Sequence, residues 1–235
     1  MAIAALVVAI GSVAVSVSYG RRSTAVAARS AAAADLSADA ADKAAGAAAI
    51  TAGLDADRRH AELTPRFRIT CAQSNPGADS MSLVIHLLGL PELERLDGLT
   101  VVIRDDHPWR GQGTPLAGGP TPEEIARQIW GRYRFTPGTG PSADSVRGIP
   151  GADPTGRTTP TGGLPVGEEL QFQLEPNHAP LWSQQSLDAW QQQMGPWLRL
   201  RLECHREGQP PWVLPCEMKI ENGVGYTEVP APPGS

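Results

Sequence analysis

Two patterns of apolar and polar residues divide the chain near residue 62. Residues 1–62 are rich in alanine and keep a helical spacing, whereas residues 63–220 contain short runs in which apolar and polar side chains alternate. Alternation with a period of two places the apolar side chains on one face of a β-strand. The pattern therefore predicts a long N-terminal helix followed by a mainly β domain.

The first 20 residues contain no charged side chain. At about 1.5 Å per residue, such a helix covers most of a hydrocarbon core of about 30 Å. We therefore predict that residues 1–22 anchor the chain in the lipid bilayer, and we disfavour a cleaved signal peptide because no basic segment precedes the apolar run. Arg21, Arg22 and Arg29 follow the span. Basic flanks tend to stay in the cytoplasm, which predicts a single-pass protein of the cell membrane with a cytoplasmic globular domain.

Residues 23–62 are predicted to form an alanine-rich helical stalk. Five blocks of seven residues begin at Ala25, and the first four carry small or apolar side chains in their second, third and seventh positions. Because alanine has the highest helix propensity, we expect one helix from the span to about His60. A heptad repeat is typical of a coiled coil, but alanine buries less apolar area than leucine or isoleucine. The stalk is therefore either a weak homo-oligomer through its alanine heptads or a solvated single helix.

The globular part, residues 63–220, contains six segments with the alternation expected of strands. These segments are residues 66–71, 82–88, 99–105, 170–174, 198–205 and 212–218. Pro215 in the last segment lacks a backbone donor, which predicts an edge strand. Parallel strands would need helices between them, and only two short helices are evident. The predicted fold is therefore an antiparallel β-sandwich of the immunoglobulin-like type.

The two short helices are predicted from their end signals. The first spans residues 122–130 and begins after Thr121, which forms a capping box with Glu124 three residues later. The second spans about residues 186–194 and ends at Gly195.

Two further segments are predicted to lack regular structure. Residues 137–167 contain eight glycines and six prolines, a composition that favours a flexible loop within the domain. Residues 221–235, which follow the last predicted strand, are predicted to be a disordered tail.

Charge and cysteine content exclude several classes of function. The chain has 20 basic and 25 acidic residues and no basic cluster, so nucleic acid is not an expected partner. Cys71, Cys204 and Cys216 are an odd number without a C-x-x-C spacing. That pattern argues against a disulfide framework and against a zinc site. We expect the three cysteines to be reduced and buried.

Asp105, Asp106 and His107 are the strongest candidates for chemistry. They follow a predicted strand, and paired carboxylates beside an imidazole bind a divalent ion or share a proton. One hypothesis is therefore a membrane-bound, metal-dependent hydrolase. The simpler interpretation is a solvated turn that ends the strand, because no second cluster of metal ligands is present. The sequence contains no nucleotide-binding, serine-hydrolase or zinc-peptidase motif, so we expect no metal and no cofactor and favour a non-enzymatic protein.

Tryptophan is unusually frequent, with six residues against three phenylalanines and three tyrosines. Trp109 and Trp130 lie near predicted loops and helix ends, beside Arg110, Arg132 and Tyr133. Tryptophan, tyrosine and arginine carry much of the binding energy in protein interfaces. We therefore predict that these five residues bind a protein partner. The alternative role for the tryptophans is to fill the open edges of the sandwich.

Four segments that follow the span and the alanine heptads carry a resemblance to other proteins. They read ADRRHAELTPRFRITC, LPELERLDGLTVVIRDD, TPEEIARQIWGRYRFTPG and LRLRLECHREGQPPWVLPCE. With the preceding part of the chain they resemble a group of actinobacterial-type, single-pass membrane-anchored proteins to which no activity is assigned. The resemblance implies an anchor, a helical stalk and a β-rich domain, and it implies no functional residues. The expected function is a membrane-tethered protein-interaction or scaffold module.

Overall fold

A computed structural model of the chain describes residues 2–74, 79–89, 94–104, 106, 119–140 and 151–229, with side chains from residue 26 onward. The chain divides into two compact units, Met1–Arg58 and Arg59–Ser235. Among the residues whose side chains are described, no helix is both long enough and apolar enough to cross a membrane. The predicted anchor, residues 1–22, lies outside them.

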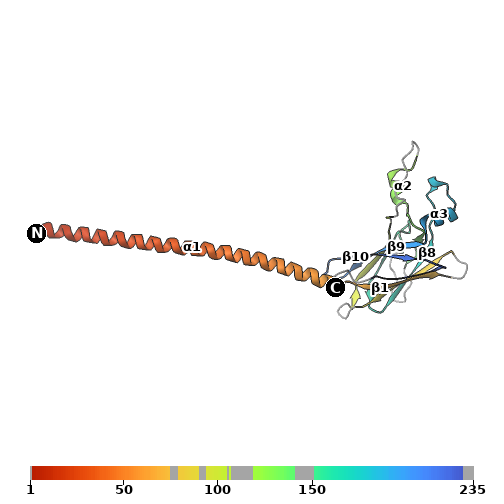
Figure 1. Cartoon of the computed structure of the whole chain (residues 1–235), viewed down its shortest axis with the longest axis horizontal. Coiled ribbons are helices and arrows are strands. Elements are labelled where there is room, and N and C mark those ends of the chain that lie inside the picture. The colour runs from red at the N-terminus through yellow and green to blue at the C-terminus, as the bar shows by residue number, and fades with distance from the viewer. Residues whose placement is uncertain are drawn as a thin grey trace. The chain divides into compact units, whose positions relative to one another are not determined.

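Helix α1 runs from Ala2 to Glu62 (Figure 1). The prediction of a long alanine-rich helix is therefore confirmed. Its larger apolar side chains from residue 26 onward are between 61% and 72% exposed, and they are Val26, Leu36, Ile50 and Leu54. Self-association through the alanine heptads stays a prediction.

The last turn of α1 belongs to the second unit, which begins at Arg59. The imidazole of His60 stacks on the indole of Trp212 at a centroid distance of 4.7 Å, and Trp212 Nε1 donates a hydrogen bond to the His60 carbonyl at 3.0 Å. Aromatic stacking combined with a hydrogen bond at a helix end ties this turn to the domain. The unit therefore begins slightly before the predicted boundary at residue 63.

The second unit is built mainly from antiparallel strands. One sheet contains β1 (Arg66–Gln73), β2 (Met81–Leu88), β5 (Tyr133–Phe135), β8 (Glu169–Pro176) and β11 (Val224–Val229). A second sheet contains β4 (Gly98–Ile103), β6 (Thr158–Thr161), β9 (Trp197–His205) and β10 (Trp212–Lys219). The strand orders are β11-β1-β2-β8-β5 in the larger sheet and β10-β9-β4-β6 in the smaller sheet. A separate short pair joins β3 (Arg95–Leu96) to β7 (Leu164–Pro165).

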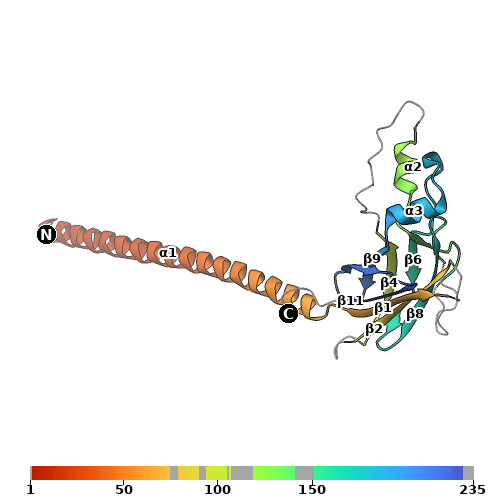
Figure 2. The same ribbon diagram turned by 45° about the vertical axis from the view of Figure 1, so that its right-hand side comes forward.

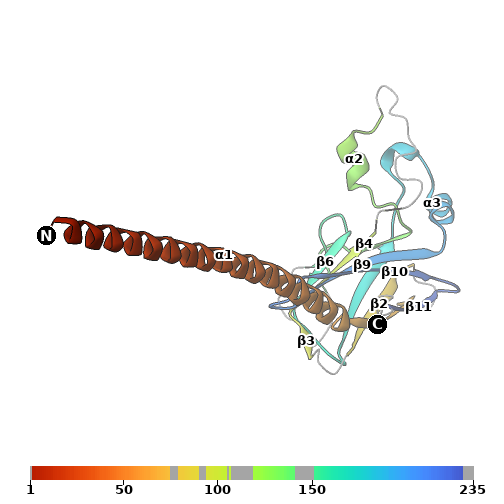
Figure 3. The ribbon, with the colours of Figure 1, turned by 60° about the vertical axis from the view of Figure 1, so that its left-hand side comes forward.

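The inner faces of the two sheets share one hydrophobic core. Figure 3 separates β4, β6, β9 and β10 from β2 and β11, which belong to the other layer. Phe67 and Ile69 of β1 are fully buried, as are Leu200 and Leu202 of β9, while their chain neighbours are not. Burying one such side chain contributes about 1.5–3 kcal/mol. The mainly antiparallel β domain predicted from alternation is confirmed.

All six predicted strands form, as β1, β2, β4, β8, β9 and β10. Pro215 lies in β10, which is at the edge of the smaller sheet. This edge position was predicted from the missing backbone N–H of proline.

The prediction of a flexible loop over residues 137–167 is wrong for residues 158–165, which include β6 and β7. β6 pairs with β4 over four residue positions. A turn at Asp153, whose carboxylate accepts backbone hydrogen bonds, directs the chain into β6. The tertiary pairing therefore overrides the high glycine and proline content. Residues 141–150 lie outside the described residues.

The prediction of a disordered tail over residues 221–235 is wrong for the residues of β11. Asn222 and Gly223 both have positive φ, at 51° and 77°, and the residues that flank them exchange two backbone hydrogen bonds of 2.9 Å. This is the geometry of a type I′ turn, for which Asn-Gly is a preferred dipeptide. The turn returns the chain to pair with β1. Residues 230–235 lie outside the described residues.

Both predicted short helices form, at the same end of the domain (Figures 1 and 2). The helical elements there are α2 (Pro122–Arg127), the single-turn 3₁₀ helix η1 (Leu181–Ser183) and α3 (Leu187–Met194). Thr121 and Glu124 form the predicted capping box, with bonds of 2.7 and 3.2 Å. α2 ends three residues before Trp130, where the prediction placed its end, because Ile129 turns into the core and is 3% exposed.

Candidate functional site

Three of the five residues predicted to bind a partner lie between α2 and β8. Trp130, Arg132 and Tyr133 lead from α2 into β5, at the end of the domain that carries α3. Trp109 and Arg110, the other two residues, lie outside the described residues.

Trp130 and Trp190 pack together and join α3 to this segment. Their ring centroids are 5.8 Å apart with planes tilted by 50°, and Trp190 is 1% exposed. Tilted aromatic pairs of this kind stabilise a fold beyond the area they bury. The contact therefore gives Trp130 a packing role. Packing, rather than partner binding, is the alternative role that the sequence allowed for the tryptophans.

Asn177 and Gln191 hold the backbone of residues 129–133. The side chain of Asn177 is buried, and its Nδ2 donates to the carbonyls of Ile129 at 2.6 Å and Gly131 at 3.0 Å. Gln191 Nε2, from α3, donates to the Arg132 carbonyl at 2.9 Å. The role of neither residue was predicted from the sequence, because an isolated asparagine or glutamine carries no periodic signal.

Arg132 and Tyr133 line an open cavity of about 410 Å³, which we call the end cavity. The guanidinium carbon of Arg132 lies 5.5 Å from the centroid of the Tyr133 ring. Burial raises the pKa of the Tyr133 phenol, an effect that the positive charge of Arg132 partly opposes. The phenol is therefore protonated at neutral pH and acts as a hydrogen-bond donor or acceptor. The other polar side chains that line the cavity are Gln73, Asp79, Asp188, Gln191 and Asn222.

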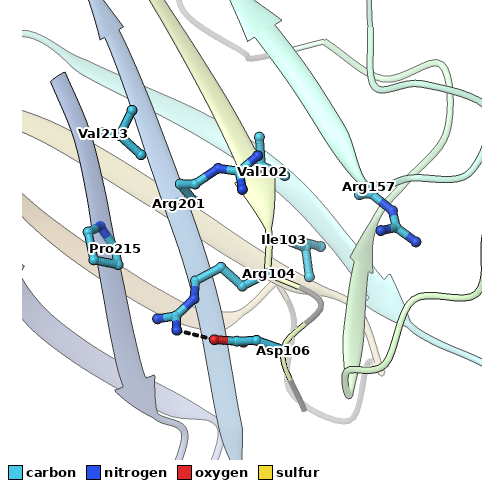
Figure 4. A pocket seen from close by; sticks show the side chains of 8 residues that line it. All are labelled: Val102, Ile103, Arg104, Asp106, Arg157, Arg201, Val213 and Pro215. Carbon is cyan, nitrogen blue, oxygen red and sulfur yellow. Dashed lines mark hydrogen bonds and ion pairs between the residues drawn. The ribbon is translucent and has the colours of Figure 1, made fainter. Parts of the chain in front are cut away.

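A second open cleft, of about 380 Å³, lies on the outer face of the smaller sheet (Figure 4). We call it the arginine cleft, and it is lined by Val102, Ile103, Arg104, Asp106, Arg157, Arg201, Val213 and Pro215. Three guanidinium groups and one carboxylate leave an excess of positive charge in the lining. Arg157 Nη2 is held by the carbonyls of Ala126 and Gln128, at 2.9 and 3.0 Å.

Arg201 lies at the centre of this cleft. The register of the sheet places it opposite Val102 on β4 and opposite Pro215 on β10. Its Nε donates to Glu203 at 2.8 Å, and its side chain is 45% exposed. Sequence reasoning missed the cleft, because its arginines belong to separate segments that only strand pairing brings together.

Asp106 is the one residue of the metal-site hypothesis that the structure describes. It is exposed and forms an ion pair with Arg104. Asp105 and His107 lie outside the described residues. Within the described part of the chain, no three histidine, cysteine, aspartate or glutamate side chains come close enough to hold a metal ion. The contact with Arg104 fits the simpler interpretation, in which Asp106 belongs to the turn that ends β4.

The three cysteines are buried and unpaired, as predicted. Burial raises the pKa of each thiol to about 12. Because the thiolate is the reactive form, these side chains are inert at neutral pH. His205 is exposed beside buried Cys204, so alternation along β9 separates the imidazole from the thiol.

Comparisons of the chain with protein-family models, with curated proteins and with solved structures gave no match.

Proposed function

We propose that the chain is a membrane-tethered, non-enzymatic protein-interaction or scaffold module. Residues 1–22 anchor it in the cell membrane, α1 acts as a spacer, and the β domain binds a protein partner on the cytoplasmic side. The observation that carries the proposal is the end cavity, in which the partner-binding candidates Arg132 and Tyr133 lie beside polar side chains of α3.

The composition of the end cavity supports a binding role. A guanidinium and a phenol lie together in its lining, with the guanidinium carbon of Arg132 5.5 Å from the centroid of the Tyr133 ring. Arginine and tyrosine are residue types that carry much of the binding energy in protein interfaces.

The backbone beneath the cavity is ordered before any partner binds. The Arg132 carbonyl accepts hydrogen bonds from the backbone N–H of Asn177 and from Gln191 Nε2, both at 2.9 Å. Ordering flexible groups on binding costs about 0.5–1.5 kcal/mol for each side chain that is immobilised. A surface fixed in advance avoids part of this cost, as interaction sites on rigid elements do.

We also propose that the domain is an immunoglobulin-like sandwich. In that fold one sheet has the strand order A-B-E-D and the other contains C, F and G. The orders β1-β2-β8-β5 and β4-β9-β10 support this assignment. In it, β11 and β6 are additions at the edges of the two sheets.

Site-specific photo-crosslinking of the full-length chain in its native membrane tests the binding role. A photoreactive amino acid in place of Asp188, which lines the end cavity and is exposed, should give a crosslinked protein product. The matched control carries the same group in place of Ala189, which is exposed on the same helix and does not line the cavity.

Arg132→Gln in the Asp188-labelled chain should reduce the product about tenfold, because it removes one charged contact. Arg127→Gln, at the exposed end of α2, should leave the product unchanged. Equal products from the two labelled positions, or no product from Asp188, would contradict a partner in the end cavity.

A further inference from the structure

We propose that the arginine cleft binds an acidic segment of a partner protein in an extended conformation, with carboxylates at alternate positions. The cleft shares no lining residue with the end cavity. It is therefore a second site, and its test is independent of the crosslinking from Asp188.

The sheet register sets the spacing that the ligand must match. Arg201 and Arg199 are alternate residues of β9 on the outer face, and Glu217 of β10 lies opposite Arg199. Arg104, at the end of β4, donates its backbone N–H to the Arg199 carbonyl at 2.9 Å. Residues two positions apart along a strand of the sheet are separated by about 6.6 Å, and alternate side chains of an extended peptide have the same separation. Carboxylates at positions i and i+2 therefore meet Arg201 and Arg104 together.

Arg201 offers donors to such a ligand. Among the described residues its polar partner is Glu203, which contacts Nε. The two Nη groups remain for a carboxylate, a geometry in which arginine binds tightly through two parallel hydrogen bonds. Figure 4 shows the Arg201 side chain crossing from β9 over Val102 of β4, inside the cleft.

Arg104 already holds a carboxylate from its own chain. Its Nη2 pairs with Asp106, and its Nη1 donates to Glu217 at 3.1 Å. The exposed Asp106 marks a position where a carboxylate fits against the guanidinium. A ligand carboxylate replaces Asp106 there, while Glu217 keeps Arg104 in place.

The remaining lining favours a protein segment over a phosphate polymer. Val102, Val213 and Pro215 offer apolar contacts beside the arginines. Glu203 and Asp106 border the arginines and repel an anion that carries charge at every position, such as a nucleic acid. Two carboxylates at alternate positions satisfy both features, because the methylene groups of their own side chains contact the apolar lining, while the residue between them faces away from the sheet.

Fluorescence anisotropy with three labelled peptides tests the spacing on the full-length protein in mild detergent. One peptide carries a glutamate-valine-glutamate core, the second carries glutamate-glutamate-valine, and the third carries glutamine-valine-glutamine, all between glycines. The first should bind, and the second should bind about tenfold more weakly because one carboxylate points away from the sheet. The third should not bind, and binding of the first should weaken as salt is raised.

Two matched variants test the location. Arg201→Gln should weaken binding of the first peptide about tenfold, through loss of a charge-assisted contact. Arg68→Gln is the control, because Arg68 is a similarly exposed arginine paired with Glu228 on the larger sheet, and it should leave the affinity unchanged. Circular dichroism of both variants checks that they are folded.

Three results would overturn the proposal. They are equal binding of the alternate and adjacent glutamate peptides, equal effects of the two arginine variants, and full displacement of the peptide by polyphosphate at matched charge. The last result would assign the cleft to phosphate polymers. If Arg201→Gln fails to fold, the comparison of the three peptides on the unaltered protein decides the question.

Discussion

Replacement of Asp153 by asparagine should destabilise the β domain by about 2–3 kcal/mol. Asp153 Oδ1 accepts hydrogen bonds from Thr155 N at 2.8 Å, Thr155 Oγ1 at 2.6 Å and Arg157 N at 3.2 Å, and Oδ2 accepts one from Thr158 N at 2.9 Å. These four bonds form the turn that leads into β6 and positions Arg157 in the arginine cleft.

The magnitude follows from what asparagine retains. Its single oxygen replaces Oδ1, but its amide N–H₂ then faces the N–H of Thr158, so one bond is lost and two donors oppose each other. A hydrogen bond to a charged group contributes about 1.5–3 kcal/mol, and the three bonds that remain become weaker neutral bonds. The side chain of Asp153 is partly exposed, so water recovers some of the loss.

The pH dependence of the effect has a defined sign. Burial is the largest single influence and raises the pKa of the Asp153 carboxyl, but the bonds from Thr155, Arg157 and Thr158 together outweigh it, and the pKa lies below its usual 3.8. A carboxyl with a lowered pKa in the folded state stabilises the protein above its unfolded pKa and loses this contribution as the pH falls through the folded value. The difference between wild type and Asp153→Asn should therefore be complete at pH 7 and shrink below about pH 3.8.

Urea denaturation of the full-length protein, followed by tryptophan fluorescence at pH 7 and pH 3, measures both effects. Glu169→Gln is the control, because Glu169 is exposed at the start of β8. It should change the free energy of unfolding by less than about 0.5 kcal/mol. A similarly small change for Asp153→Asn at pH 7, or a difference as large at pH 3 as at pH 7, would refute the role given to this carboxylate.

Three further predictions concern packing, the cavity floor and the thiols. Trp190→Ala should cost about 3–5 kcal/mol of unfolding free energy in urea, and Trp190→Phe should cost less, because Trp190 fills the space beneath α3; equal losses would contradict this packing role. Asn177→Ala should lower stability by about 2–4 kcal/mol, since two backbone carbonyls lose their donor, and an unchanged thermal midpoint would contradict that role. Cys71, Cys204 and Cys216 should resist alkylation at pH 8 in the native protein and react in urea, because burial raises the pKa of each thiol to about 12; rapid labelling of the native state, followed by mass spectrometry, would contradict their burial.

Local signals in the sequence were sufficient to predict the longer helices and strands. Alternation predicted β1 and β9, because burying one face of a strand imposes a period of two. The capping box at Thr121 and Glu124 predicted α2, and Pro215 predicted the edge position of β10. The Asn-Gly pair at residues 222–223 was a further local signal, and it would have predicted the turn into β11.

The short strands were beyond local reasoning. β5 has three residues, and β6 lies in a segment rich in glycine and proline. Each is stabilised by a partner strand distant in the sequence, β8 for β5 and β4 for β6. Neither strand is long enough to show a periodic pattern, so each is recognised only from its pairing with another strand.

The candidate sites also have features that neighbouring residues determine and features that only the tertiary structure determines. The sequence alone placed Trp130, Arg132 and Tyr133 together, because they are neighbours in the chain. It also predicted that the three cysteines are buried, and alternation along β9 accounts for the inward position of Cys204.

The tertiary structure decided which of these residues meet others. It turned Trp130 toward Trp190, placed Arg132 and Tyr133 in a cavity with α3, and paired Asp106 with Arg104. It also assembled the arginine cleft from distant segments of the chain. The physical reason is that side-chain alternation and helix capping depend on adjacent residues, whereas strand order and register depend on burial of both sheets in one core.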